Sequence, residues 1–292
     1  MQLIEIRVLP FNFIGLVKAH GWVNLAPFSW REEDACLIRP LMSRHDELIH
    51  TEIRVITNRR ESVVHVSLAK RLHKGEIQDL ESKILRMLCL RLDYSEFHSL
   101  CKNDPNLRFV HDEKFGGLLR GETLFEDLIK TVCTTNCDWR NTKKMCEALC
   151  QINHGCFPTP KMLLEFSEKK LSCKAPVGYR ARTILEISRL IADEALPLEE
   201  WAEDGNYGLI KERLRCIWGL GTYSIAHILV LLGCYEEIPV DSEYLKYIST
   251  THYGGREISI EEATRPYENY GKYKFLAYKH ERIGRKRNYI DK

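Results

Sequence analysis

Two helical repeats joined by a glycine-containing turn constrain the fold of this chain more than any other feature. Between Leu209 and Val240, apolar residues recur at spacings of four and three on either side of Gly219-Leu220-Gly221-Thr222. This spacing places the apolar side chains on one face of each helix, so we expect the helices to pack together as a hairpin. The repeating positions are Ile210, Leu214 and Ile217 before the turn, and Ile225, Leu229 and Leu232 after it.

The turn of this hairpin has features of a phosphate-binding loop. Gly219 and Gly221 permit a positive φ and leave no Cβ in the way, so backbone N–H groups can approach a phosphate closely. We expect Leu220 to fill the inside of the hairpin and Thr222 to cap the second helix. Glycine turns between helices are common, and a purely structural hairpin is the alternative at this point.

Composition indicates an ordinary globular protein. Hydrophobic residues make up 44% of the 292 residues and charged residues 29%, which argues against disorder. No apolar run reaches the roughly 18 residues that span a bilayer, and the Val8–Val17 segment lacks a cleavage site, so we expect an intracellular protein without a membrane partner. The 11 cysteines include no CxxC pair, which favours core packing over a metal site.

The chain divides into a β-rich part and a helical part. Short β-like runs occupy 3–9, 35–41, 48–57 and 62–68, and an amphipathic helix is expected over Glu76–Leu92. From about residue 120 onward only helical patterns occur, ending in a basic tail that includes Arg285-Lys286-Arg287. We therefore predict an α+β fold, with an antiparallel β domain over 1–115 and an all-helical body over 116–292. The helices are expected at 123–134, 139–150, 159–169, 179–194, 207–218, 222–233, 242–250 and 266–284.

Several ordered motifs together resemble the helix–hairpin–helix DNA glycosylase superfamily. Its signature is a hairpin of this kind followed by an aspartate, here Ile238-Pro239-Val240-Asp241. Leu124–Cys137, Val177–Arg182 and Tyr270–Tyr278 are similar to segments of the 3-methyladenine glycosylase II and 8-oxoguanine glycosylase branches. The similarity is strong over about 120–282 and weaker over 1–115. It implies the same predicted architecture, with a helix–hairpin–helix glycosylase body after the β domain.

The resemblance implies a reaction and a catalytic residue. Breaking an N-glycosidic bond passes through a sugar cation, and Asp241 would stabilise that cation and orient the attacking water; capping the next helix is its structural alternative. Bifunctional members carry a lysine where this chain has Tyr223, and a phenol cannot form a Schiff base. We therefore predict a monofunctional glycosylase without lyase activity through residue 223. Another lysine, such as Lys246, is the remaining candidate for an amine nucleophile.

The resemblance also implies which side chains contact base and DNA. Tyr223 would wall the base pocket, and an aromatic cage is typical of sites for cationic alkylated bases. Its other candidate members are Trp218, Trp139, Tyr273 and Phe275. The residues expected to bind DNA are Gly219, Leu220, Gly221 and Thr222 of the hairpin, with Asn136, Tyr179, Arg180 and Arg182.

These observations predict an enzyme of base-excision repair that removes a damaged purine from double-stranded DNA, and an alkylated purine is the expected substrate. The alternatives are removal of oxidised or deaminated bases, and a damage-binding protein that has lost catalysis. We expect a monomer in the cytoplasm of a prokaryote or the nucleus of a eukaryote. No cofactor is expected apart from a monovalent cation held by hairpin carbonyls, because no cysteine follows Cys234 to hold an iron–sulfur cluster.

Overall fold

The computed structural model describes residues 2–43, 47–197, 200, 203 and 205–290. They form two compact units, which we call the sheet unit (Met1–Asp93 with Glu113–Pro197) and the hairpin unit (Tyr94–Asp112 with Leu198–Lys292). The sequence predicts a domain boundary near residue 115, where strand patterns give way to helical patterns. The two units are instead defined by which residues contact one another. The division into two domains at that boundary therefore stays a prediction.

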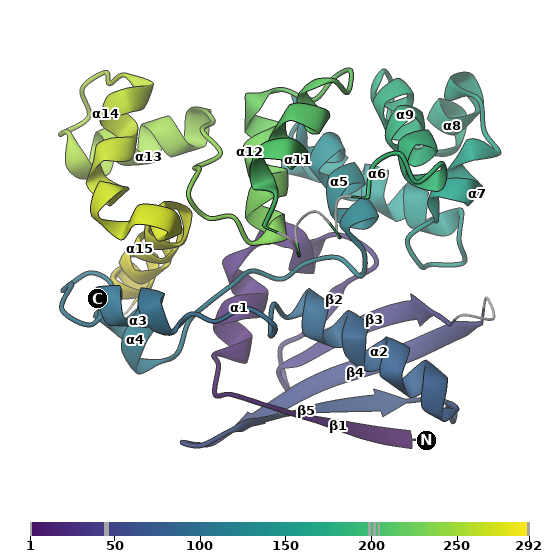
Figure 1. Cartoon of the computed structure of the whole chain (residues 1–292), viewed down its shortest axis with the longest axis horizontal. Helices are drawn as coiled ribbons and strands as arrows, with labels where there is room; N and C mark the ends of the chain where they lie inside the picture. Colours follow the sequence, from purple (N-terminus) through teal and green to yellow (C-terminus); the bar gives the residue numbers. More distant parts are fainter. Residues whose placement is uncertain (1, 44–46, 198–199, 201–202, 204, 291–292) are drawn as a thin grey trace. The chain divides into compact units, whose positions relative to one another are not determined.

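An antiparallel sheet forms the base of the sheet unit, as predicted (Figure 1). The strand order is β1-β5-β4-β3-β2, and the register aligns Ile4, Val66, Ile53 and Leu37 across four strands. All four of these side chains are buried, so the alternation in the sequence gives the sheet one covered face. The strands are β1 (Gln2–Val8), β2 (Ser29–Arg31), β3 (Cys36–Met42), β4 (Leu48–Thr57) and β5 (Ser62–Leu68).

Helices complete the sheet unit, and α2 lies along the sheet with Leu80, Ile84 and Met87 buried (Figure 1). It ends at Met87 and not at the predicted Leu92, because Cys89 takes a positive φ of 54°. The helix predicted over 159–169 is two short helices, since Ser167 caps a new one. The helices are α1 (Phe13–Ala19), η1 (Gly21–Asn24), α2 (Lys74–Met87), α5 (Leu124–Thr134), α6 (Trp139–Gln151), α7 (Pro160–Leu164), α8 (Glu168–Lys174) and α9 (Arg180–Ala192).

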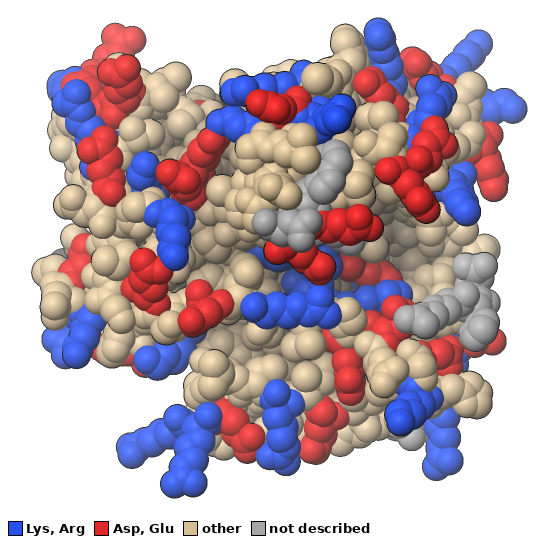
Figure 2. Space-filling view, viewed as in Figure 1, with Lys and Arg blue, Asp and Glu red and all other residues tan. Residues whose placement is uncertain are grey.

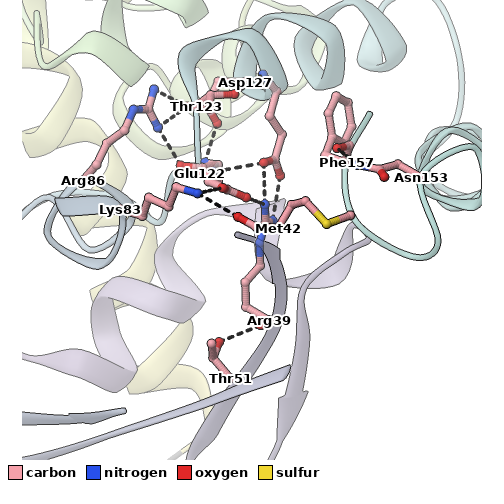
Figure 3. Close-up of polar contacts among 12 residues, drawn as sticks. Arg39, Met42, Thr51, Lys83, Arg86, Glu122, Thr123, Asp127, Asn153 and Phe157 are labelled. Carbon is pink, nitrogen blue, oxygen red and sulfur yellow. Dashed lines mark hydrogen bonds and ion pairs between the residues drawn. The ribbon is translucent and has the colours of Figure 1, made fainter. Parts of the chain in front are cut away.

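Buried ion pairs join α5 to the sheet and to α2 (Figure 3). The Arg39 guanidinium on β3 makes two hydrogen bonds of 2.8 and 2.7 Å to the Glu126 carboxylate, which also meets Lys130 Nζ at 2.6 Å. Arg86 on α2 bonds Asp127 at 3.0 Å. The surrounding cations hold the pKa of Glu126 well below its ordinary value despite full burial. Breaking such a pair leaves a buried charge uncompensated, so α5 is held firmly in place.

The hairpin unit consists of helices. The segment before Asp112 packs on the C-terminal part of the chain, where the Phe97 and Tyr273 rings lie 5.4 Å apart. The helix predicted over 266–284 begins as a 3-10 helix and kinks at Gly271, whose φ is 50°. The helices are α3 (Ser95–Cys101), α4 (Arg108–Asp112), α11 (Tyr207–Arg215), α12 (Thr222–Leu232), α13 (Ser242–His252), α14 (Ile260–Thr264), η2 (Arg265–Tyr273) and α15 (Lys274–Ile290). Within the described part of the chain, every helix is too short or too polar to span a bilayer.

Candidate active site

The predicted hairpin is present as α11, a short turn and α12. Leu220 is buried with only 8% of its surface exposed, and Gly219 takes a φ of 83° that favours glycine. Thr222 is the first residue of α12 and not its cap, which corrects the prediction, because the extended residue before the helix is Gly221. With glycine at that position, no side chain caps the first turn of α12. A helix start without a side-chain cap is suited to accept an anion such as phosphate.

Asp241 lies exposed at the start of α13. Its Oδ1 accepts a hydrogen bond of 2.7 Å from the backbone N–H of Tyr244. The carboxylate therefore caps the helix, which is the structural role predicted from the sequence as the alternative to catalysis. Among the described residues, Oδ2 makes no hydrogen bond or ion pair. The cap thus fixes one oxygen and leaves the other without a partner among the described residues.

Two side chains of α12 form part of the surroundings of Asp241. Burial, together with the Asp241 charge, raises the pKa of the Tyr223 phenol to about 12, so this side chain stays neutral. The Tyr223 ring stacks on His227 with centroids 5.8 Å apart. Burial and then the charge of Lys279 lower the pKa of His227 to about 3, so the imidazole is neutral as well. This side of the site is therefore an uncharged, partly aromatic wall.

The middle of α15 supplies residues that the sequence prediction missed. Arg282 donates a hydrogen bond of 3.0 Å to the Tyr278 hydroxyl, and its guanidinium lies 3.9 Å from the Glu243 carboxylate in the first turn of α13. Burial, with Arg282 and Lys286 nearby, lowers the pKa of Lys279 to about 8, against the opposing effect of Asp241. In the sequence these residues belong to a basic C-terminal stretch that is typical of a solvated tail, so no pattern indicated that they lie near Asp241.

The predicted aromatic cage is not assembled in the hairpin unit. Tyr273 donates a 3.2 Å hydrogen bond to Glu96, and both Tyr273 and Phe275 are buried among the packed helices of the unit, so they are core residues. Trp139 belongs to the sheet unit, where its ring lies over Gly21. Trp218 is 43% exposed beside the hairpin turn. Of the predicted pocket residues, Tyr223 is the one that the structure associates with Asp241.

The two segments of the sheet unit that were predicted to contact DNA meet each other. Asn136, which takes a φ of 47°, donates a 3.4 Å hydrogen bond to the hydroxyl of Tyr179, and both side chains are exposed. Arg180 is buried, and its guanidinium donates to the Thr135 carbonyl and lies 4.7 Å from the Tyr179 ring centre. Its predicted contact with DNA is therefore replaced by support of the Asn136 turn. Arg182 is exposed, and its role stays a prediction.

Neither the surface charge nor the candidate metal ligands of the described residues indicate a further binding site. Figure 2 shows basic and acidic side chains interspersed over the visible face, in line with a formal net charge of only +2. Among the described residues, no group of three or more His, Cys, Asp or Glu side chains is arranged to hold a metal ion.

Comparison with known proteins identifies the fold. No family model and no curated protein matches the sequence. The 3-methyladenine DNA glycosylase of Archaeoglobus fulgidus covers 98% of both chains with a TM-score of 0.73 and 16% identity. The 8-oxoguanine glycosylase/lyase of Clostridium acetobutylicum, in complex with double-stranded DNA, covers 99% of both chains with a TM-score of 0.69 and 18% identity. The 3-methyladenine DNA glycosylase of Schizosaccharomyces pombe covers 65% of this chain and 95% of its own, with a TM-score of 0.52 and 18% identity. The chain therefore has the α+β fold of the helix–hairpin–helix DNA glycosylases.

Proposed function

We propose that this protein is a DNA glycosylase that hydrolyses the N-glycosidic bond of a damaged base extruded from duplex DNA. The observation that carries the proposal is the Asp241 carboxylate, exposed and held by the first turn of α13 at the place in the fold that follows the hairpin. The helix cap uses only Oδ1, and a protein that only bound damaged DNA would have no chemical need for the second carboxylate oxygen. The fold shared with glycosylases of two substrate classes supports the same conclusion.

The chemistry uses the negative charge of Asp241. The bond to the base breaks with a positive charge developing on the sugar, as in other glycoside hydrolyses. A carboxylate ~4 Å from that charge, at an effective dielectric of ~20, stabilises it by about 4 kcal/mol. The same group can take a proton from the attacking water as the C1′–O bond forms. Because the Oδ1 atom is fixed by the helix cap, the carboxylate needs little reorganisation during the reaction.

DNA binding is assigned to two exposed features, one in each unit. The uncapped start of α12 after Gly219 and Gly221 would bind a phosphate with its backbone N–H groups. Asn136 and Tyr179, already joined by a hydrogen bond, would fill the space that the extruded base leaves. Each phosphate neutralised by a basic side chain should lower the logarithm of the affinity by ~0.9 per logarithmic unit of salt.

We propose a monofunctional enzyme that uses water and no lysine nucleophile. Tyr223 occupies the position where lyases of this fold class carry the lysine, and Lys246 is exposed on α13. Lys279, with a pKa of about 8, is mostly an ammonium at pH 7 and is then a poor nucleophile. Borohydride treatment at pH 7 with abasic-site DNA should therefore give no covalent complex, and efficient trapping would show a lyase. A monomer inside the cell, with a monovalent cation at the hairpin, completes the proposal.

Two candidate classes of lesion differ in the surroundings that they require. An alkylated purine, the sequence-based prediction, called for an aromatic cage, and Tyr273 and Phe275 are core residues instead. The second candidate, a neutral oxidised or deaminated base, is favoured by the ammonium of Lys279 near Asp241.

A panel of duplexes, each with one lesion, tests the proposed function. The panel contains 7-methylguanine, 8-oxoguanine, hypoxanthine and uracil, with an undamaged duplex as the control. We expect a free base and an alkali-labile abasic site from at least one lesion, and none from the control. Tight binding to a lesion without release of any base would instead show a damage-binding protein.

A further inference from the structure

An ammonium group lies in the hairpin unit close to the first turn of α13. Lys279 is in the middle of α15, three residues before Arg282, whose guanidinium lies 3.9 Å from Glu243 of that turn. Residues three apart share a helix face, and the Lys279 ammonium interacts electrostatically with Asp241, so Lys279 lies on the side of α15 that is near the first turn of α13. Within the described residues, the Lys279 ammonium makes no hydrogen bond or ion pair of its own. Its donors therefore remain available for a ligand.

The charged and titratable groups around Lys279 come from three helices. Asp241 at the start of α13 and His227 on α12 interact with it electrostatically, while Arg282, Lys286 and His280 belong to its own helix. Burial and the two neighbouring cations lower the pKa of Lys279 to about 8, and the imidazole of His227 is neutral. At pH 7 the ammonium therefore keeps its charge, and Asp241 is the one nearby anion that these interactions identify.

This charge affects neutral and cationic bases in opposite ways. A base alkylated on its ring carries a positive charge before the bond breaks and leaves as a neutral molecule. A neutral oxidised or deaminated purine leaves with the electron pair of the C1′–N9 bond and becomes an anion unless it is protonated. A fixed cation beside the leaving base repels the first kind and stabilises the second in the transition state.

We propose that the ammonium of Lys279 contacts the extruded base and selects a neutral damaged purine over a cationic alkylated one. The proposal deepens the glycosylase function above and depends on it. In the reaction, the electron pair of the C1′–N9 bond passes to the base while an N–H of Lys279 donates to its developing negative charge. Water then forms the bond to C1′, and its proton goes to the Asp241 carboxylate. The departed base takes a proton from solvent, so charge and atoms balance.

The test compares two lesions in single-turnover excision with the wild type and with Lys279→Met, Lys279→Arg and Lys274→Gln. The substrates are duplexes with one hypoxanthine, which is neutral, or one 7-methylguanine, which is cationic. Lys279→Met should lower the rate on hypoxanthine by ~30-fold or more, and leave the rate on 7-methylguanine unchanged or raise it. Lys279→Arg keeps the charge and should retain most of the preference. Lys274→Gln, on the same helix, should leave both rates unchanged.

The dependence on pH provides a second readout. Between pH 7 and 8.5, the wild-type rate on hypoxanthine relative to 7-methylguanine should fall as Lys279 loses its proton. The ratio should stay flat in Lys279→Arg, because arginine keeps its charge. An equal loss on both lesions in Lys279→Met, or a wild-type ratio that does not change with pH, would overturn the proposal and leave the glycosylase function standing. A wild type that excises neither these two bases nor any other in the panel would overturn both.

Discussion

Replacing Lys279 with methionine should make the protein more stable at neutral pH. The side chain is partly buried, and its pKa is lowered from 10.5 to about 8 chiefly by burial. At roughly 1.4 kcal/mol per pH unit, this difference corresponds to a cost of about 3 kcal/mol for carrying the charge in the folded state. Methionine has a similar length and no charge, so we expect about 1–3 kcal/mol of added stability at pH 7.

The sign of the pH dependence follows from the same two values. Because the pKa is lower in the folded than in the unfolded state, the unfolded chain binds more protons between pH 8 and 10.5. The wild type therefore gains stability over that interval, and the advantage of Lys279→Met should be full below pH 8 and should shrink above it. A functional residue that lowers stability is a common feature of binding sites.

The assay is urea unfolding followed by tryptophan fluorescence at pH 7, 8 and 9, with Lys246→Met as the control. Lys246 is exposed on α13, so its replacement should change the free energy of unfolding by less than about 0.5 kcal/mol. The reasoning is refuted if Lys279→Met is no more stable than the wild type at pH 7. It is refuted equally if the difference between the two proteins does not depend on pH.

Three further predictions concern the scaffold. Glu126→Gln should lower the free energy of unfolding in urea by about 3–5 kcal/mol, because the two cations paired with Glu126, Arg39 and Lys130, stay buried. A loss below about 1 kcal/mol would contradict this prediction. The pKa values of His227 and His280 are lowered to about 3 and 4, mainly by burial, so the stability that their neutral forms provide is present above pH 6.5 and falls toward pH 4. Urea unfolding should show a loss of about 2 kcal/mol per histidine between pH 6.5 and 5. Gly219→Ala should lower the free energy of unfolding by about 1 kcal/mol, because Gly219 has a φ of 83° that disfavours alanine. The same variant should bind duplex DNA more weakly, as measured by fluorescence anisotropy.

Local patterns predicted the hairpin and the position of Asp241. The apolar spacing around Gly219 specifies two packed helices, and an aspartate before a helical pattern is a capping residue by its chemistry. The sheet was predicted because β-branched residues alternate along its strands. The three-residue strand Ser29–Arg31 was missed, since so short a segment carries no period.

The surroundings of the site were not predictable because they depend on contacts between distant segments. Arg180 looks like an exposed cation in the sequence, but Thr135, 45 residues earlier, supplies the carbonyl that binds it. Lys279 lies in a basic stretch, and only the packing of α12, α13 and α15 makes it a partly buried ammonium. Tyr273 and Phe275 are aromatic residues on a helix, and sequence alone does not distinguish a pocket wall from a core.

The most direct test of the central claim is the single-turnover rate of Asp241→Asn on whichever lesion the wild type excises. Asparagine caps a helix as well as aspartate, so α13 should keep its start and the affinity for DNA should stay within threefold. Loss of about 4 kcal/mol of transition-state stabilisation predicts a rate about 10³-fold lower. A variant that releases the base within tenfold of the wild-type rate would show that the carboxylate at this position does not carry the chemistry.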